Sequence, residues 1–422
     1  YGQVILSSGG RLFQPTQVGA PGENARLMKD ENDRRSIRLD DGSDQQNPSP
    51  VPFINSTTKT LRAGDSALGM TGIITFRHDN YTLVSTKPVE FVSTNPRPVN
   101  PPEVGGNVKV ASFNVLNLFN GDGSGVGFPT SRGADSRVEF DRQFAKIVNA
   151  IHQMDADIVG LMEIENDGYE SASALQQLVD ALNEQADNRS GHYRIVEPSD
   201  SVGTDEIKVA MIYRPAKLAI AGQPAVITAG PLKHRRPALA ASFSFEDRES
   251  QTLPDTFTVV VNHFKSKGCR GSFDENEDQN DGQGCWNPAR AEAAKAIIAA
   301  VATSRTGVDD PDVLVIGDLN AYSNEDPVQE FVRNGYHDLL TEIHGSDVYT
   351  YIYRGQAGVL DHALATSSLR SKVNDAEVWY INADEPRLLD YNTEYNPKGL
   401  YDESPFRSSD HDPVLVGLNL GS

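Results

Sequence analysis

The chain is poor in cysteine, with only Cys269 and Cys285 among its 422 residues. Both lie in a stretch rich in glycine and acidic residues, which is too polar to bury two free thiols as a reduced cytosolic protein would. A disulfide that closes a short loop suits this stretch better, and an unstrained one stabilises a fold by about 3 kcal/mol. The sequence therefore predicts a Cys269–Cys285 disulfide and an oxidising compartment, either the periplasm or the outside of the cell.

Long hydrophobic runs are also absent. No stretch of about 18 apolar residues occurs, which excludes a membrane-spanning helix. The chain starts at Tyr1, and its opening stretch YGQVILSSGG has no basic region followed by an apolar one. We therefore expect that a signal peptide has already been removed.

Basic residues are scarce: 38 Lys and Arg stand against 59 Asp and Glu, which gives a formal net charge of −21. A basic surface is the usual mark of a nucleic-acid-binding protein, so this composition argues against binding through overall charge. The imbalance is uneven, because residues 1–98 carry 11 basic and 10 acidic residues, whereas residues 99–422 carry 27 and 49. A polyanionic ligand of the C-terminal part must therefore be held by a few local contacts.

The length and the hydrophobic content of 38% allow a sizeable core and favour two domains. The stretch NPRPVNPPEVGG has the composition of a semi-rigid linker, so we predict domains over 1–98 and 107–422 with a linker over 99–106. In the first domain, short β-like runs broken by turns predict a small all-β barrel of the OB type. A generic β-domain without a ligand fits this pattern about as well.

After the linker, apolar strands alternate with amphipathic helices, which predicts an α/β or α+β fold with sheets buried in its middle. The expected strands are 108–113, 156–162, 208–213, 256–262 and 312–316, and the expected helices lie around 144–151, 175–182 and 288–301.

Polar side chains follow four of these strands. They are Asn114, Glu163, His263 and, after the last strand, Asp318 with Asn320. One such ending is weak evidence, because Asp and Asn commonly form turns after strands. Four buried strands that all end in residues able to bind metal or phosphate indicate a shared site.

Two more polar clusters lie near the C-terminus. Asp410 and His411 occur in the segment SSDHDP before an apolar strand, and Asp361 follows an apolar pair. Taken alone, SSDHDP is explained slightly better as a turn that starts an edge strand. Neither cluster indicates a function by itself.

In this order along the chain, the segments SFNVLN, DIVGLMEIEN, VNHFKS, GDLNA, LDHAL and SSDHDP resemble the endonuclease/exonuclease/phosphatase family, typified by DNase I. The segments YGQVILSSGGRLFQP, SRGADSRVEFDRQ and GCWNPAR are similar to large extracellular bacterial nucleases, in which an OB-like domain precedes the catalytic one. The resemblance implies an α/β fold: a DNase I-like two-sheet α/β sandwich, preceded by a small all-β OB-like barrel. It also implies an active site at one edge of the sandwich and a secreted, extracellular bacterial protein.

The resemblance assigns a metal site to Glu163, as the principal carboxylate ligand, with Asn114 and Asp410 beside it. Oxygen ligands of these types select hard cations. The implied ion is Mg²⁺, for which Mn²⁺ can substitute.

The resemblance also assigns the catalytic residues. Asp318 and Asn320 orient the nucleophile and the scissile phosphate, and His411, oriented by Asp361, activates water or stabilises the transition state. A histidine suits this role because it exchanges protons near neutral pH, and a carboxylate behind it fixes its tautomer.

The second histidine, His263, matches the family's general acid toward the leaving oxygen. Asp205 and Glu206 are two alternatives for its carboxylate partner. Basic residues near the predicted site, Lys265, Lys267 and Arg132, are expected to contact substrate phosphates, although such side chains are usually solvated.

The loop between the cysteines alternates acidic and amide side chains, as calcium-binding loops do. Its candidate ligands for a structural or activating Ca²⁺ are Asp274, Asn276, Asp278 and Asn280. The loop lacks the glycine and the final glutamate of an EF-hand, so a solvated acidic loop is an equal alternative.

Together these observations predict a secreted, monomeric, divalent-metal-dependent nuclease that hydrolyses DNA, most simply as a non-specific endonuclease, and they leave RNA open as a second substrate. A lipid or inositol phosphodiesterase or phosphatase on the same fold is the alternative, which the nuclease-like segments disfavour. A catalytically dead nucleic-acid-binding protein would lack one of Glu163, Asp318, His263 and His411, and all four are present.

Overall fold

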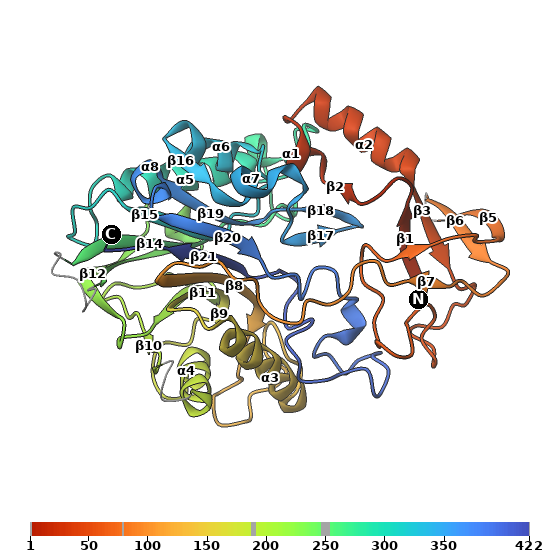
Figure 1. Ribbon diagram of the computed structural model, residues 1–422, viewed down its shortest axis with the longest axis horizontal. Helices are drawn as coiled ribbons and strands as arrows, with labels where there is room; N and C mark the ends of the chain where they lie inside the picture. The colour runs from red at the N-terminus through yellow and green to blue at the C-terminus, as the bar shows by residue number, and fades with distance from the viewer. Residues whose placement is uncertain (1, 78–79, 187–190, 246–253, 422) are drawn as a thin grey trace.

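The computed structural model describes residues 2–77, 80–186, 191–245 and 254–421, and its largest part is a sandwich of two six-stranded sheets (Figure 1). The first sheet has the strand order β10-β11-β9-β8-β21-β20, and the second has the order β12-β13-β14-β15-β19-β16. The strands of the first sheet are β8 (Val108–Leu118), β9 (Ile158–Glu165), β10 (Arg194–Ile195), β11 (Ile207–Tyr213), β20 (Val373–Val378) and β21 (Val414–Leu418). Those of the second are β12 (Leu218–Ile227), β13 (Ala238–Phe245), β14 (Asp255–His263), β15 (Val313–Asp318), β16 (Tyr336–Asp338) and β19 (Asp361–Thr366). The predicted two-sheet α/β sandwich is confirmed.

Three hydrophobic clusters hold the layers together. The inner faces of the sheets share one core, which contains Phe243, Phe257 and Val261. Helices α3 (Arg137–Met154) and α4 (Ala174–Gln185) pack on the outer face of the first sheet, and α5 (Asn287–Val301) and α6 (Asp326–Arg333) pack on that of the second (Figure 1). The shorter helices are α7 (Leu339–His344), α8 (Ser367–Arg370) and the 3-10 turns Gly230–His234, Asp274–Asn276, Gly345–Asp347 and Arg387–Leu389.

The directions of the central strands bring several strand ends to one edge of the sandwich. β8 and β9 are parallel, as are β14 and β15. β21 runs antiparallel to β8, and β19 runs antiparallel to β15. Within each sheet, the ends of the parallel pair therefore lie at the same edge as the beginning of the antiparallel neighbour, β21 in the first sheet and β19 in the second.

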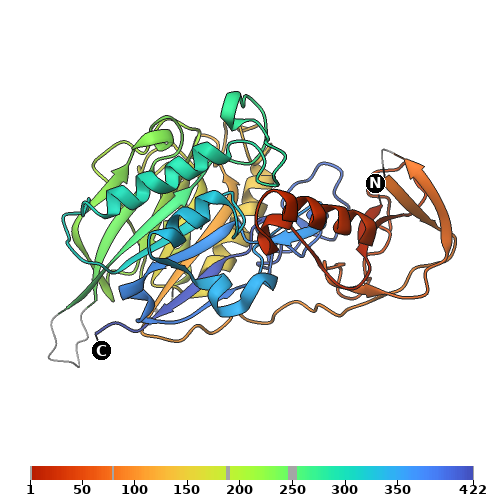
Figure 2. The same ribbon diagram turned by 90° about the horizontal axis from the view of Figure 1, so that it is seen from above.

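The N-terminal unit, residues 2–98, lies at one end of the sandwich (Figures 1 and 2). Its main sheet has the order β1-β3-β6-β5, and a second sheet pairs β4 with β7. These strands are β1 (Gln3–Ser7), β3 (Ser36–Asp40), β4 (Ser66–Ala67), β5 (Gly72–Arg77), β6 (Asn80–Ser85) and β7 (Phe91–Val92). The predicted OB-like barrel is not confirmed, because the described strands form open sheets.

The same unit contains a 13-residue helix, α2 (Glu23–Arg35), within a region for which only β-structure was expected. The helix buries only Ala25 and Asn32, so it has no apolar stripe that sequence periodicity could detect. Its surface instead carries ion pairs one turn apart, such as Lys29 with Asp33. Each such pair stabilises a helix by about 0.2–0.5 kcal/mol.

The start of the N-terminal unit is built into the sandwich. β2 (Leu12–Phe13) pairs in parallel with β18 (Gln356–Gly358), which forms a hairpin with β17 (Tyr351–Tyr353). The short helix α1 (Pro15–Val18) follows, and its Thr16 and Gln17 are buried. The division into domains at 99–106 stays a prediction, because residues 12–18 belong to the packing of both parts.

Cys269 and Cys285 form a disulfide, with their Cα atoms 5.1 Å apart, as predicted. The bond ties the start of the acidic loop to the residue just before Trp286, the N-cap of α5. In the described part of the chain, no helix combines the length and the apolar character needed to cross a membrane.

Candidate active site

Six of the predicted residues meet at the edge where the strand ends converge. Asn114 lies in β8 and Glu163 in β9, while His263 and Asp318 are the last residues of β14 and β15. In the second sheet His263 lies beside Asp318, and Asp318 lies beside Asp361, the first residue of β19. Neighbouring strands lie about 4.8 Å apart, so these side chains form a row. His411 completes the group from the loop before β21.

His411 and Asp361 form a buried pair. The Nδ1 atom of His411 lies 2.7 Å from Oδ2 of Asp361, and the Thr350 hydroxyl donates to the same carboxylate oxygen at 2.8 Å. The ring of Tyr351 stacks on the imidazole with a centroid distance of 4.5 Å. These contacts fix the ring plane and leave Nε2 of His411 3.9 Å from Oδ2 of Asp318.

Asp318 lies between the two histidines. Its Oδ2 atom is 3.5 Å from Nε2 of His263 and accepts hydrogen bonds from the side-chain amides of Asn114 at 3.3 Å and Asn320 at 3.1 Å. The Asn320 main-chain N–H donates to the other carboxylate oxygen at 2.8 Å. The carboxylate is therefore oriented by two amides while both imidazoles face it.

The backbone is unusual at two of these residues. Glu163 has φ of 66° and Asn320 has φ of 48°, in the left-handed region that few side chains other than Asn and Asp adopt. The register between β9 and β11 also shifts opposite Glu163, between Lys208 and Ala210. Bulges re-aim side chains next to active sites, and backbone strain concentrates at such positions. The irregularity accounts for how Glu163 reaches the row of side chains.

Burial and charge shift the acid strengths of this group. Burial raises the pKa of Glu163, and the Asp410 carboxylate raises it further. Burial raises the pKa of Asp318 to about 7 against the opposing attraction of His411. Although burial lowers the pKa of His411, the carboxylates of Asp361 and Asp318 raise it well above its usual value.

His263 has a different environment. Burial lowers its pKa well below the usual value, and the guanidinium of Arg236 lowers it further. Neither expected partner contacts the ring: Asp205 binds Arg236 at 3.3 Å, and Glu206 binds Arg132 at 2.9 Å. Within the described residues the buried Nδ1 of His263 has no hydrogen-bond partner. The structure therefore does not place a carboxylate behind this histidine.

The oxygen atoms near Glu163 fit a divalent cation. Its Oε2 atom is buried without a hydrogen-bond partner in the described structure, and Oε1 accepts from Asn114 at 3.2 Å. Among the described residues, Glu163 and Asp318 form ion pairs with histidines only, and Asp410 forms no ion pair. Asn114 turns its NH₂ group toward Glu163 and Asp318, and its Oδ1 atom accepts from the main chain of Leu116. The carboxylate oxygens are therefore the donors that a hard cation would bind here.

The predicted phosphate-binding residues have varied surroundings. Lys267 binds Glu325 and the Gln283 carbonyl at 2.6 Å, which favours a structural role. Arg132 is partly exposed and pairs with Asp205 at 3.6 Å as well as with Glu206. Lys265 lies near the ring of Trp286, 5.6 Å from its centroid.

Three residues that support the site were not predicted. Thr350 holds Asp361, Asn382 donates to the His411 carbonyl at 2.7 Å, and Arg236 donates to the His263 carbonyl at 3.1 Å. Two of these contacts are made to main-chain oxygens, which leave no signal in residue type. Only the fold brings these residues to the site.

The calcium loop stays a prediction, and two of its candidate ligands hold the local backbone. Asn276 accepts from the main chain of Ala289 and so anchors α5, and Asp278 accepts from the main chain of Asn280. Among the described residues, groups of three potential ligands within 4.8 Å of one another occur elsewhere, at His344 with Asp375 and Glu377 and at Asp135 with Glu139 and Glu394. Neither group includes a predicted site residue.

Comparison with known proteins gives a family model and solved structures that each match most of the chain. A model of the Endonuclease/Exonuclease/phosphatase family matches residues 111–411. The curated proteins contain no match. The catalytic domain of human Nocturnin is 14% identical, covering 73% of this chain and 93% of that chain with a TM-score of 0.44. A mannosyl-6-phosphatase of Bacteroides thetaiotaomicron is 18% identical (74% and 99% covered, TM-score 0.44), and D. rerio TDP2 with a single-strand DNA product is 11% identical (73% and 97%, TM-score 0.42).

Proposed function

The chain belongs to the endonuclease/exonuclease/phosphatase family, whose members are hydrolases of phosphate esters, and we propose that it is a secreted nuclease that cuts the phosphodiester bonds of DNA. The observation that carries this proposal is that His263 and His411 face the Asp318 carboxylate from two sides, at 3.5 and 3.9 Å. Hydrolysis of a phosphodiester needs a proton-transfer pair, hydrogen-bond donors and a cation at one phosphorus.

Each side chain has a part in this proposal. The carboxylates that raise the pKa of His411 keep it protonated near neutral pH, so His411, oriented by Asp361, donates the proton to the leaving oxygen. Burial and Arg236 lower the pKa of His263 and keep it neutral, so His263 accepts the proton of the attacking water. Asp318 and Asn320 orient the water and the phosphate. General acid–base catalysis of this kind contributes roughly 10²–10⁴-fold to a rate.

Glu163 and Asp410 would hold a divalent cation, because the buried Oε2 of Glu163 has no other partner in the described structure. Bound there, Mg²⁺ or Mn²⁺ would neutralise charge that develops on the phosphate oxygens. Ca²⁺ is proposed only as a structural ion, since Asn276 and Asp278 use their side chains to hold the local backbone.

Two observations support a nuclease outside the cell. The disulfide between Cys269 and Cys285 suits an oxidising compartment. Three segments spread over the chain resemble extracellular bacterial nucleases rather than phosphatases of the same family. DNA is the proposed substrate, and RNA is an outcome of the test.

One set of reactions tests the proposal. Supercoiled plasmid, linear duplex, single-stranded DNA and RNA are each incubated with Mg²⁺, Ca²⁺, both ions or EDTA. We expect nicking of the plasmid with Mg²⁺ and none with EDTA, because the proposed reaction needs the cation. A closed circle has no ends, so nicking would show an endonuclease. Parallel assays measure phosphate release from a sugar phosphate and an inositol phosphate. Activity on these monoesters without any cleavage of DNA would replace the nuclease proposal by the phosphatase alternative.

A further inference from the structure

Gln17, from the start of the N-terminal unit, lies between two segments that carry active-site residues. Its side chain is 1% exposed. The Oε1 atom accepts from the main chain of Val359 at 3.0 Å, and Nε2 donates to the Ser323 hydroxyl at 3.2 Å. Val359 is two residues before Asp361, and Ser323 is three residues after Asn320. One buried amide therefore joins both segments.

The Val359 segment leads directly to the orienting carboxylate. Thr350 donates to Asp361 and accepts from the main chain of Leu360 at 3.0 Å and of Asp361 at 3.1 Å. Strand β2 of the N-terminal unit pairs with β18, which ends at Gly358. Residues 356–361 are thus held by Thr350 on one side and by the N-terminal unit on the other.

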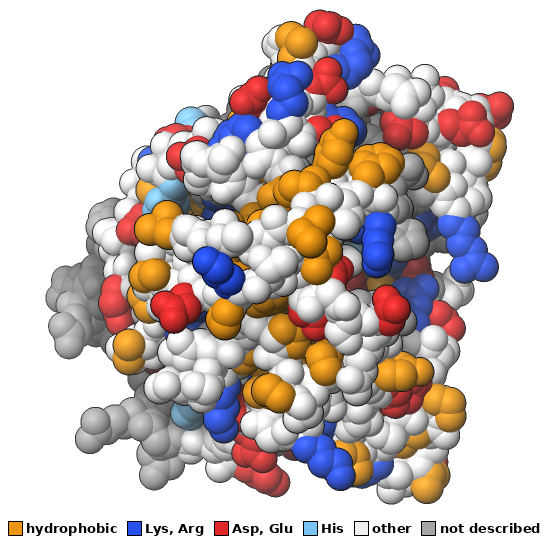
Figure 3. Space-filling model, turned by 90° about the vertical axis from the view of Figure 1, so that its right-hand side faces the viewer, with side chains coloured by type: hydrophobic (Ala, Val, Ile, Leu, Met, Phe, Trp, Pro, Cys, Tyr) orange, Lys and Arg blue, Asp and Glu red, His pale blue; other side chains and the backbone are white. Residues whose placement is uncertain are grey.

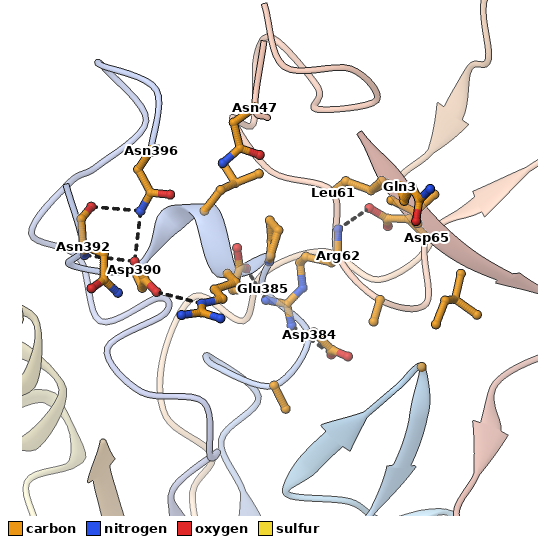
Figure 4. A pocket seen from close by; sticks show the side chains of 18 of the residues that line it. Gln3, Asn47, Leu61, Arg62, Asp65, Asp384, Glu385, Asp390, Asn392 and Asn396 are labelled. Atoms are coloured by element: carbon orange, nitrogen blue, oxygen red, sulfur yellow. Dashed lines mark hydrogen bonds and ion pairs between the residues drawn. The ribbon is translucent and has the colours of Figure 1, made fainter. Parts of the chain in front are cut away.

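The N-terminal unit also reaches the His411 side of the site. Arg62, which is 3% exposed, contacts Asp384 at 3.2 Å and Glu385 at 2.5 Å, and the three residues line a cavity of about 820 Å³ between the two units (Figure 4). Asn382, two residues before Asp384, donates to the carbonyl of His411. Both members of the His411–Asp361 pair therefore stand on segments anchored by residues 2–98.

We propose that the N-terminal unit completes the active site, with Gln17 as a positioning residue for the His411–Asp361 pair; this inference rests on the proposed function of that pair. Gln17 touches no substrate and acts by fixing residues 359–361. Main-chain atoms that lose such a buried partner either stay unsatisfied or move to find another. A displacement of about 1 Å at a catalytic group can cost 10²-fold in rate.

The test compares two buried, adjacent positions in the full-length protein. Gln17→Met keeps the length of the side chain and removes both hydrogen bonds. Thr16→Val is the matched control, because Thr16 is equally buried and donates at 2.6 Å to Glu325, away from residues 359–361. We expect Gln17→Met to lower kcat on DNA by about 10- to 100-fold with KM changed less than about twofold. Thr16→Val should leave kcat within about twofold while lowering thermal stability to a similar extent.

A second readout does not depend on activity. Hydrogen–deuterium exchange of peptides covering residues 349–361 should rise in Gln17→Met and stay at the wild-type level in Thr16→Val. Gln17→Glu keeps the acceptor for Val359, so its kcat and exchange should lie between those of the wild type and Gln17→Met. If Gln17→Met does not fold, Gln17→Glu is compared with Thr16→Val in the same way.

The outcomes separate the two proposals. Wild-type protein that cuts no nucleic acid with any metal overturns the proposed function, whatever the exchange data show. An active wild type whose Gln17 variants match Thr16→Val in kcat and in exchange at 349–361 overturns the positioning role alone. Equal losses of kcat in the Gln17 and Thr16 variants also overturn it, because they indicate general destabilisation.

Discussion

His263 and His411 both face the Oδ2 atom of Asp318. His263 lies beside Arg236, and His411 lies beside Asp361. We expect His263→Ala and His411→Ala each to lower kcat by about 10²–10⁴-fold, because each removes one end of a proton-transfer pair. The double variant should be little worse than the poorer single variant, since residues that act as a unit are not additive. Steady-state rates of plasmid nicking give kcat for the wild type, the two single variants and the double variant. The control is His337→Ala, which changes a partly exposed histidine that pairs with Glu342 away from the proposed site. A correctly folded His411→Ala variant with nearly full activity would contradict the assignment.

At the residue scale, sequence predicts side chains that bear chemistry and misses those that support them. Glu163, His263 and Asp318 could be predicted because each follows a buried apolar run, where a polar residue is conspicuous. Neither carboxylate expected behind His263 contacts its ring, and Asp205 pairs with Arg236 instead. Such competition between neighbours depends on three-dimensional distances that residue types do not encode.

At the element scale, the disulfide closes a loop whose regular structure is the 3-10 turn Asp274–Asn276 and fixes it to the start of α5. Its 16-residue separation corresponds to a loop whose closure stabilises a fold by about 3 kcal/mol in the chain-entropy model. We expect the double variant Cys269→Ser/Cys285→Ser to unfold at a lower temperature than the wild type and to retain the Mg²⁺ requirement. Reduced wild-type protein is the matched comparison, because the chain has no other cysteine. Identical unfolding temperatures for oxidised wild type and variant would show that the bond does not stabilise the fold.

Elements with a regular apolar pattern were predicted better than those without one. The strands β8, β9 and β14 were expected within a few residues of their bounds, because buried β-structure gives continuous apolar runs. Helix α2 was not expected, because it is largely solvent-exposed and its stability comes from local charge pairs. The pairing of β2 with β18 joins segments more than 340 residues apart, and no local pattern reports such a contact.

At the scale of the whole molecule, buried ion pairs join the N-terminal unit to the rest of the chain. Burial opposes ionisation of Glu385, but Arg97 and Arg62 outweigh it and hold the pKa of that carboxyl below its usual value of 4.5. A carboxyl with a depressed folded pKa contributes stability that is complete above the unfolded pKa and is lost as pH falls through the folded pKa.

Arg97→Met should therefore lower stability by about 2 kcal/mol at neutral pH, and the difference from the wild type should shrink below pH 4.5. Thermal unfolding measured at several pH values tests this. The control is Arg34→Met, which removes an exposed pair with Glu31 and should have little effect at any pH. A difference between Arg97→Met and wild type that stays constant into the acid range would rule out this coupling.

The charge distribution of the whole molecule sets how salt should affect DNA binding. Three cations near the proposed site are already paired with carboxylates: Arg132 with Glu206, Arg236 with Asp205, and Lys267 with Glu325. On the face formed by the N-terminal unit, basic and acidic side chains alternate and do not merge into one basic area (Figure 3). Few side chains are thus left to neutralise phosphates, and we expect a shallow dependence of affinity on salt.

Each neutralised phosphate of duplex DNA contributes about −0.9 to the slope of log affinity against log salt concentration. The His411→Ala variant, which should bind without cutting, allows the affinity to be measured from about 50 to 200 mM salt. A slope near −2 would correspond to roughly two phosphate contacts, with the divalent cation supplying the remaining attraction. Lys265→Ala should then reduce the slope by about one contact, whereas Arg38→Ala on the N-terminal sheet tests whether that unit takes part. A slope as steep as that of 6–10 contacts would contradict the expectation, because the paired cations would then have to exchange their carboxylates for phosphates.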